Sequence, residues 1–346
     1  MNQRVSIFIL AATYVGSVVG AGFSSGKEIV TFFSLNGVLG TLGIAVSGFL
    51  FMVAGMKIMV ISARIQAYSF REFNAYLFGA RIGKVVNLLI FIITVCVTSV
   101  LLSGAGAVFH EQLGIPFQVG IIVTLLLCYI VILKGLKGIF AINAYTVPIM
   151  IIFSLFVALA IFDQHPHELL ELVIPEQTLA GSSWAVSPFT YSAFNIMTAQ
   201  VVLVPLGNEI RDERILKWGG FLGGLVLFFL LLMNHFSLSA FPETFLYEIP
   251  MAEIVIRFGT VIHILFLFVI YGEIFNSVIG NVFGISRQLE ATFGLRYHHT
   301  VLMILFVIFL VSQAGYGKLV TVLYPLLGYM SLFALLFLLF KKMPAK

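Results

Sequence analysis

A stretch rich in glycine and serine near the N-terminus holds the first residues whose types and spacing could bind a small solute. Residues 14–28 read YVGSVVGAGFSSGKE, within a long apolar segment. Each glycine weakens a helix by about 1 kcal/mol relative to alanine, and broken backbone at membrane depth is tolerated only where it is buried in protein or lines a cavity. We therefore expect a helix that ends near the middle of the bilayer and restarts near Ser24, with free amides and carbonyls facing a ligand. The alternative is a continuous helix whose small residues allow close packing.

A second apolar segment, from Trp184 to Gln200, is also unusually polar. Ser192, Asn195 and Thr198 fall at membrane depth within it. Polar groups at this depth either line a solute path or hydrogen-bond between helices, and the latter contributes about 0.6 kcal/mol each. We expect a second interrupted helix here, with hydrogen bonding between helices as the alternative.

One carboxylate lies deep inside a later apolar segment. Glu273, Asn276 and Ser277 follow one another at helical spacing i, i+3 and i+4, so they share a helix face. An ionisable group inside a span is costly and is a functional hypothesis by default. Glu273 would serve as a proton carrier or as an anionic ligand for sodium; the alternative is a structural salt bridge to Lys27. Lys27 and Glu28 could equally form a pair near the outer vestibule.

The composition places the chain among membrane proteins. Hydrophobic residues make up 60% of the 346 residues and charged residues 10%, with a mean hydropathy of +1.09, whereas soluble domains carry about 25% charged residues. The net charge of +4 comes from short loops, so it does not indicate nucleic-acid binding. We expect no enzymatic activity, no bound cofactor and no metal site, and we interpret both cysteines as core residues.

Ten segments are apolar enough to be membrane spans of a single transmembrane domain, residues 1–346. They are Val5–Phe33, Val38–Ser62, Val85–Val108, Phe117–Leu133, Ile139–Phe162, Pro188–Leu206, Trp218–Ser239, Ile254–Phe283, Val301–Ser312 and Leu319–Phe340. With the N-terminus inside, nearly all of the 19 basic residues fall in inner loops. The positive-inside rule therefore predicts a multi-pass protein of the cell membrane with both termini in the cytoplasm.

The ten spans divide into two sets of five, residues 1–162 and 184–340, joined by an acidic outer loop at 163–183. An odd number of spans in each half places the halves in opposite orientations. Interrupted spans at corresponding positions of two inverted halves indicate the binding site of a transporter. The glycine-rich helix opens the first half and the polar segment after Trp184 opens the second.

The run from Gly16 to Phe23, with its G-x-x-x-G-x-G spacing, resembles the broken first helix of LeuT-fold transporters in the amino acid–polyamine–organocation superfamily. The longer run from Thr13 to Ile29 is similar to that of the bacterial YkvI-like membrane proteins. The segment from Tyr191 to Asn195, followed by Val204-Pro205-Leu206-Gly207, is similar to the sixth helix of that group. The resemblance implies an all-α fold with a five-plus-five inverted repeat, in which helices 1 and 6 are interrupted around a central substrate.

The resemblance also implies roles for residues at matching positions. The amides of Ala21, Gly22 and Phe23 would face a substrate carboxylate, and carbonyls near Val18, Tyr191 and Ser192 would receive an ammonium group. Phe23 departs from the pattern, because sodium-coupled relatives often have a polar ligand there. The implied substrate-binding set is Ser17, Val18, Gly20, Ala21, Gly22, Phe23, Tyr191, Ser192, Phe194, Asn195 and Thr198. The ion-coupling set is Gly16 and Val19, through their carbonyls, with Glu273, Asn276 and Ser277, and Lys27 and Glu28 are further candidates.

These features favour a secondary active transporter of a small amino acid or related amine, driven by a proton or sodium gradient through alternating access. The chain contains no Walker phosphate loop, so an ion gradient is the expected energy source. The alternative is an amino-acid-sensing receptor subunit that binds its ligand without net transport. The expected partners are a small-molecule solute and the lipid bilayer.

Overall fold

The computed structural model describes residues 3–133, 136–164, 183–294 and 296–345, so most of the outer loop expected at 163–183 lies outside the described residues. Every regular element in these ranges is a helix, as the sequence predicts. The elements are, in order, α1 (Gln3–Val18), α2 (Ala21–Ser24), α3 (Lys27–Phe32), η1 (Ser34–Asn36), α4 (Gly37–Ile65), α5 (Phe70–Ala107), η2 (Val108–Gln112), α6 (Phe117–Leu133), α7 (Leu136–Gln164), α9 (Ser183–Ile210), α10 (Glu213–Ser239), η4 (Pro242–Leu246), α11 (Pro250–Val255), η5 (Ile256–Phe258), α12 (Thr260–Phe293), α13 (Tyr297–Ser312), α14 (Tyr316–Lys318), η6 (Leu319–Leu323) and α15 (Tyr324–Phe340).

Long apolar helices dominate the described part of the chain. Six helical stretches are long and apolar enough to cross a membrane: Lys27–Ile65, Phe70–Gln112, Trp184–Ile210, Glu213–Ser239, Thr260–Ser286 and Tyr316–Phe340. Four shorter apolar helices accompany them: Gln3–Val18, Phe117–Ile132, Pro148–Asp163 and Tyr297–Ser312. The chain is therefore a multi-pass membrane protein built from helices alone in its described ranges.

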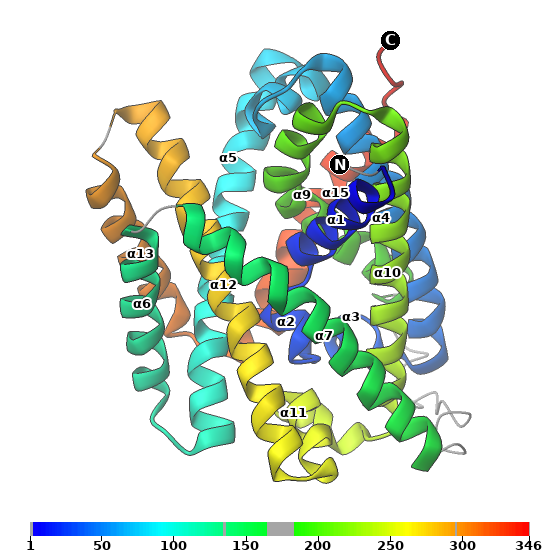
Figure 1. The fold of residues 1–346 in the computed structure, drawn as a ribbon, viewed down its shortest axis with the longest axis vertical. Helices are drawn as coiled ribbons and strands as arrows, with labels where there is room; N and C mark the ends of the chain where they lie inside the picture. Colours follow the sequence, from blue (N-terminus) through cyan, green and yellow to red (C-terminus); the bar gives the residue numbers. More distant parts are fainter. Residues whose placement is uncertain (1–2, 134–135, 165–182, 295, 346) are drawn as a thin grey trace.

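The helices form two groups that lie side by side (Figure 1). In one group, α4 packs against α9 and α10, and α1 packs against α9 and α10 as well. In the other, α5 packs against α6, α12 and α13. Helix α7 contacts α10 of the first group and α12 of the second, while α15 packs along α9. This arrangement places the short helices α2 and α3 between the two groups, because α2 contacts α5 and α12 of the second group and α3 contacts α9 and α10 of the first.

Paired glycines allow α10 to approach two neighbours closely. Cβ atoms on Gly220 and Gly224 would overlap the backbone of Met56 and Met52 in α4. On the adjacent face, a Cβ on Gly223 would overlap Tyr14 of α1. Helices in membranes associate through such close contacts between small residues, since lipid provides no hydrophobic driving force. These glycines therefore hold α1, α4 and α10 together.

The glycine-rich stretch coincides with the end of the first helix. Helix α1 ends at Val18 and α2 begins at Ala21, which is three residues before the restart expected near Ser24. The Ser24 amide donates to the Gly20 carbonyl at 2.9 Å. Gly26 then adopts a φ of +82° in the left-handed region, a conformation that glycine permits without strain. It separates α2 from α3 and sets the direction of α3.

Helix α9 differs from its expected form. It runs from Ser183 to Ile210 as one helix, so the interruption expected at Ser192–Phe194 is not present in this described segment. The segment 189–204 contains no glycine, and Thr198 Oγ1 donates to the Phe194 and Asn195 carbonyls at 3.2 and 2.9 Å. A hydroxyl group that donates to a carbonyl of the preceding turn has its hydrogen bond satisfied within its own helix. The carbonyls of Tyr191 and Ser192 therefore remain in helical conformation and are not released by an unwound turn, which corrects their expected role.

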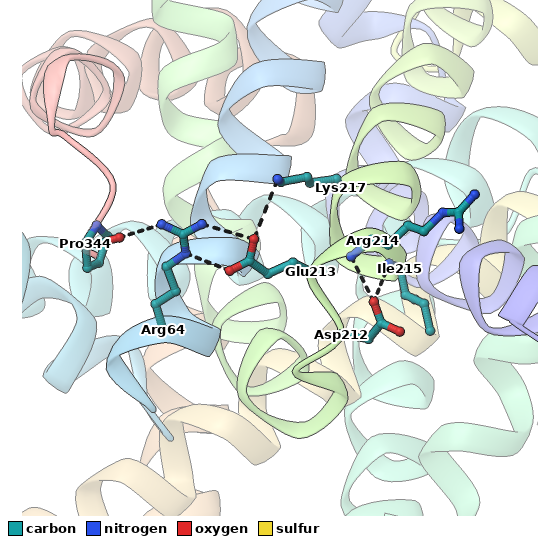
Figure 2. A network of polar contacts seen from close by, with 7 residues as sticks. All are labelled: Arg64, Asp212, Glu213, Arg214, Ile215, Lys217 and Pro344. Carbon is teal, nitrogen blue, oxygen red and sulfur yellow. Dashed lines mark hydrogen bonds and ion pairs between the residues drawn. The ribbon is translucent and has the colours of Figure 1, made fainter. Parts of the chain in front are cut away.

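A network of charged side chains connects the C-terminal end of α4 to the N-terminal end of α10 (Figure 2). Arg64 at the end of α4 binds both carboxylate oxygens of Glu213 at the start of α10, at 2.8 and 3.0 Å. Arg64 also donates to the carbonyl of Pro344 in the C-terminal tail. Asp212 caps α10 by accepting from two backbone amides of its first turn. Planar bidentate pairing of this kind holds the two helices and the tail in register.

Candidate functional site

The gap between α1 and α2 lies against the carboxylate of Glu28. A Cβ atom on Gly22 would overlap Oε2 of Glu28 and would lie 3.1 Å from the Tyr324 ring. The Glu28 side chain therefore folds back from α3 onto the first turn of α2. A Cβ on Gly20 would approach Leu101 of α5 to 3.3 Å. The backbone at the gap is thus enclosed by α3, α5 and the start of α15.

Glu28 is buried, with 4% of its surface exposed, and it links α3 to α9. The Asn195 amide donates to Glu28 Oε1 at 3.3 Å and to the Tyr191 carbonyl at 3.1 Å. The Tyr191 hydroxyl lies within electrostatic range of the carboxylate, although it completes no hydrogen bond of standard geometry among the described residues. Two residues expected in the substrate set, Tyr191 and Asn195, therefore meet Glu28 beside the gap.

Aromatic rings enclose this carboxylate. The Phe194 ring lies 4.9 Å from that of Tyr324 and 5.7 Å from that of Tyr191, and Phe32 lies 5.2 Å from Tyr191. The hydroxyls of Tyr191, Tyr324 and Tyr316 all lie within electrostatic range of Glu28. Aromatic faces attract cations, so the rings and the carboxylate both favour a positively charged group.

Lys27 points away from this cluster although it precedes Glu28 in the chain. Its ammonium group donates to the carbonyls of Phe245 and Tyr247, at 3.0 and 2.7 Å. The expected pairs of Lys27 with Glu28 or with Glu273 are therefore not formed. Adjacent residues of a helix are about 100° apart around its axis, which explains how Lys27 reaches the loop before α11 while Glu28 faces α9.

The loop before α11 is held by further polar contacts. The Glu111 carboxylate accepts hydrogen bonds from the amides of Glu248 and Ile249, at 3.0 and 2.8 Å. Burial raises the pKa of the Glu248 carboxyl above its ordinary value, Glu111 adds to the rise, and the Gly317 amide and Lys27 oppose it. The loop before α11 therefore covers the α3 end of the cluster. Its amides donate to Glu111 of η2, and its carbonyls accept from Lys27 of α3.

The remaining expected hydroxyls divide into two kinds. Ser17 donates to the Tyr14 carbonyl at 2.7 Å, and Thr198 bonds within α9, so both are engaged by their own helices. The buried hydroxyl of Ser192 in α9 has no hydrogen-bond partner among the described residues, and the same holds for Ser103 in α5, which is not in the expected set. Val18, Val19 and Phe23 are buried apolar residues around the gap. Unpartnered buried hydroxyls are uncommon, which makes Ser192 and Ser103 available to a ligand.

The expected ion-coupling side chains lie on α12. Glu273 is fully buried, Asn276 is 4% exposed, and Ser277 is partly buried. Helix α12 contacts α2, α5 and α7. Three of the five expected ion-coupling residues therefore lie on one helix that contacts α2, while Gly16 and Val19 lie in α1 and the segment after it.

Three residues around the gap were not among the expected site residues. Tyr324 belongs to the tenth apolar segment and Tyr316 lies three residues before that segment, with its hydroxyl 2.6 Å from Ser25 Oγ. Glu111 stands between two expected spans. A tyrosine at membrane depth and an acidic residue at a span end are signals in the sequence, but their partners lie more than 100 residues away along the chain.

Comparison with solved structures gives the fold. The structure matches MhsT in complex with L-phenylalanine with a TM-score of 0.72, at 14% identity over 95% of this chain and 88% of that chain. It matches a manganese transporter of Eremococcus coleocola with a TM-score of 0.62, at 15% identity over 96% and 78%. It also matches the inward-facing conformation of Mhp1 with a TM-score of 0.57, at 12% identity over 94% and 73%. The chain therefore has a LeuT-like fold.

Comparison of sequences gives the family, although no protein-family model matches the chain. The chain is 24% identical to the protein YyaD of Bacillus subtilis (strain 168), over 94% of each chain. It is 43% identical to the membrane protein YkvI of the same organism, over 97% of this chain and 96% of the relative. Identity at this level over nearly the whole of both chains, together with the run from Thr13 to Ile29, means that the protein belongs to the YkvI-like family of membrane proteins.

Proposed function

We propose that this protein is a secondary active transporter of a small amino acid or related amine. The observation that carries the proposal is the meeting of Glu28, Asn195 and Tyr191 beside the gap between α1 and α2. In this arrangement a solute held at the gap contacts α2, α3 and α9 together, and α9 belongs to the helix group that moves as a unit. Buried polar groups that converge from several helices are typical of solute sites.

The structural match to MhsT supports the choice of solute class. The solved structure of MhsT contains L-phenylalanine, so amino acids and amines of similar size are the first solutes to test. The first turn of α2 offers amides of Ala21, Gly22 and Phe23, and the end of α1 offers carbonyls near Val18. The unpartnered hydroxyls of Ser192 and Ser103 extend the set of donors and acceptors.

Alternating access follows from the two helix groups. The proposal assigns the two inverted halves to residues 1–162 and 184–340, with ten spans and both termini in the cytoplasm. The group of α1, α4, α9 and α10 would rock against the group of α5, α6, α12 and α13 around the gap. Coupling to a proton or sodium gradient is assigned to the α12 face that carries Glu273, Asn276 and Ser277, with the carbonyls of Gly16 and Val19.

Counterflow in proteoliposomes tests the proposal. Vesicles are loaded with a high concentration of one unlabelled amino acid or its decarboxylated amine, and trace labelled solute is added outside. A transporter accumulates the label transiently against its own gradient, whereas empty vesicles and vesicles with the Gly22→Leu variant do not. A protein that binds solute with no counterflow for any member of the panel is a sensor subunit, and that result would overturn the transporter proposal.

A further inference from the structure

The Glu28 carboxylate meets the gap between α1 and α2, since its Oε2 atom occupies the space beside Gly22. The resemblance to LeuT-fold transporters implied that a substrate carboxylate would face the amides at this position. The protein itself places a carboxylate there. A zwitterionic solute in the same orientation would therefore bring a second carboxylate within a few ångströms of the first, in an enclosed site where like charges repel strongly.

No basic side chain neutralises Glu28 within the described part of the chain. Lys27, the nearest basic residue in sequence, is bound to the carbonyls of Phe245 and Tyr247. The neutral side-chain amide of Asn195 donates a hydrogen bond to Glu28 Oε1 at 3.3 Å. An ionised carboxylate that is buried in this way is strongly destabilising unless a cation accompanies it. A ligand with a positive charge would stabilise the ionised form of this carboxylate.

The groups around Glu28 suit an ammonium group. The rings of Phe32, Tyr191, Phe194 and Tyr324 form a contiguous cluster with neighbouring centroids 4.9 to 5.7 Å apart. A cation above aromatic faces gains cation–π attraction, most strongly in a desolvated site. A carboxylate within an aromatic cluster therefore favours a positively charged nitrogen over a second carboxylate.

We infer that Glu28 is the counter-ion for the substrate's ammonium group, and that the solute is an organic amine with net positive charge and no carboxylate beside the amine. The inference rests on the proposed function, because it concerns the same site. It narrows the solute from amino acids and amines to amines. It also gives Glu28 a role in selectivity. Glu28 would distinguish an amine from the amino acid that has the same structure plus one carboxylate.

Matched pairs of solutes test this inference. Binding to the purified protein in nanodiscs is measured by calorimetry for leucine and 3-methylbutylamine, phenylalanine and 2-phenylethylamine, and lysine and 1,5-diaminopentane. We expect the amine to bind at least tenfold more tightly than the amino acid in at least one pair. An amino acid that binds more tightly than its amine in every pair would overturn the inference, and so would a panel in which no amine binds.

Variants of Glu28 make the test specific. Glu28→Gln should weaken amine binding at least tenfold and remove the preference within the pair, whereas Glu28→Asp should retain the preference. Glu243→Gln is the control, because Glu243 is exposed and its carboxylate pairs with Arg257 and not with any residue of the cluster around Glu28. Thermal unfolding of each variant separates lost binding from lost folding. Unchanged amine affinity in a folded Glu28→Gln protein would remove Glu28 from recognition.

The two proposals fail in different ways. If amines bind in a manner that depends on Glu28 but no labelled solute shows counterflow, the transporter proposal falls and the inference stands. If amino acids show counterflow and amines neither bind nor compete, the inference falls and the transporter proposal stands. Competition between unlabelled amines and labelled amino acids in the same vesicles distinguishes these results in one experiment.

Discussion

Gly22 has no room for a side chain, because the Glu28 carboxylate and the Tyr324 ring fill the space beside its Cα. We expect Gly22→Leu to abolish solute binding, since the leucine would displace Glu28 from the gap. Gly20→Leu should have a similar but smaller effect, because its nearest obstacle is the end of the flexible Leu101 side chain, at 3.3 Å. The measurement is equilibrium binding of the solute that gives counterflow.

The matched control for this prediction is Gly280→Leu. Gly280 lies on an exposed face of α12 with no atom near the position of an added Cβ. Its substitution should leave binding and thermal stability close to those of the unmodified protein. Normal binding by Gly22→Leu would show that the gap between α1 and α2 is not the solute site.

Asn195 connects Glu28 to α9, which distinguishes it from other asparagines at membrane depth. Asn195→Ala removes its hydrogen bonds to Glu28 and to the Tyr191 carbonyl. A hydrogen bond to a charged group contributes about 1.5–3 kcal/mol, so solute affinity should fall about tenfold or more. Asn143→Ala, whose side chain lies outside the described residues, should have the smaller effect. Equal effects on affinity would place the site away from α9.

Glu273 is the residue that we predict couples solute transport to an ion gradient. Glu273→Gln should retain solute exchange, because the amide resembles the protonated acid, and should lose accumulation driven by a pH gradient, because it releases no proton. If Glu273 instead binds sodium, uptake will require sodium at fixed pH and the variant will need higher sodium concentrations. Uptake of the variant under imposed gradients decides between these cases, and undiminished accumulation would leave Glu273 with a structural role.

At the scale of helices, glycine spacing explains where backbones meet. Gly220 and Gly224 let α10 touch the backbone of α4 at Met56 and Met52. Gly224→Val should therefore force α10 and α4 apart and destabilise the protein by about 1–3 kcal/mol. Gly280→Val should change stability little, because that position is open. Thermal unfolding of the two variants in detergent checks the comparison, and equal unfolding temperatures would contradict the packing role of Gly224.

Sequence reasoning recovered helices whose interruption has a local cause and failed where the cause was absent. The glycines between Gly16 and Gly22 weaken a helix in themselves, and α1 ends among them at Val18. The polar residues of α9 carry no such weakness, because hydroxyl groups can bond to their own helix, as Thr198 does. Polarity alone therefore led to a wrong expectation of a break at Ser192.

At the scale of the whole molecule, composition was enough to predict a multi-pass helical membrane protein, and the run from Thr13 to Ile29 was enough to predict its family. The candidate site was only partly predictable. Lys27 and Glu28 are adjacent in sequence, yet one binds the loop before α11 and the other faces α9. Their partners lie more than 160 residues away along the chain, so the separation depends on tertiary packing that no local pattern encodes.

The central claim is that this LeuT-like fold moves a solute against its gradient at the expense of an ion gradient. The most direct measurement is uptake of the labelled solute identified by binding into proteoliposomes with an imposed proton or sodium gradient. We expect accumulation above the external concentration, abolished by an ionophore that dissipates the gradient and absent in Gly22→Leu. Uptake that never exceeds equilibration under either gradient, with the protein folded and solute bound, would contradict it.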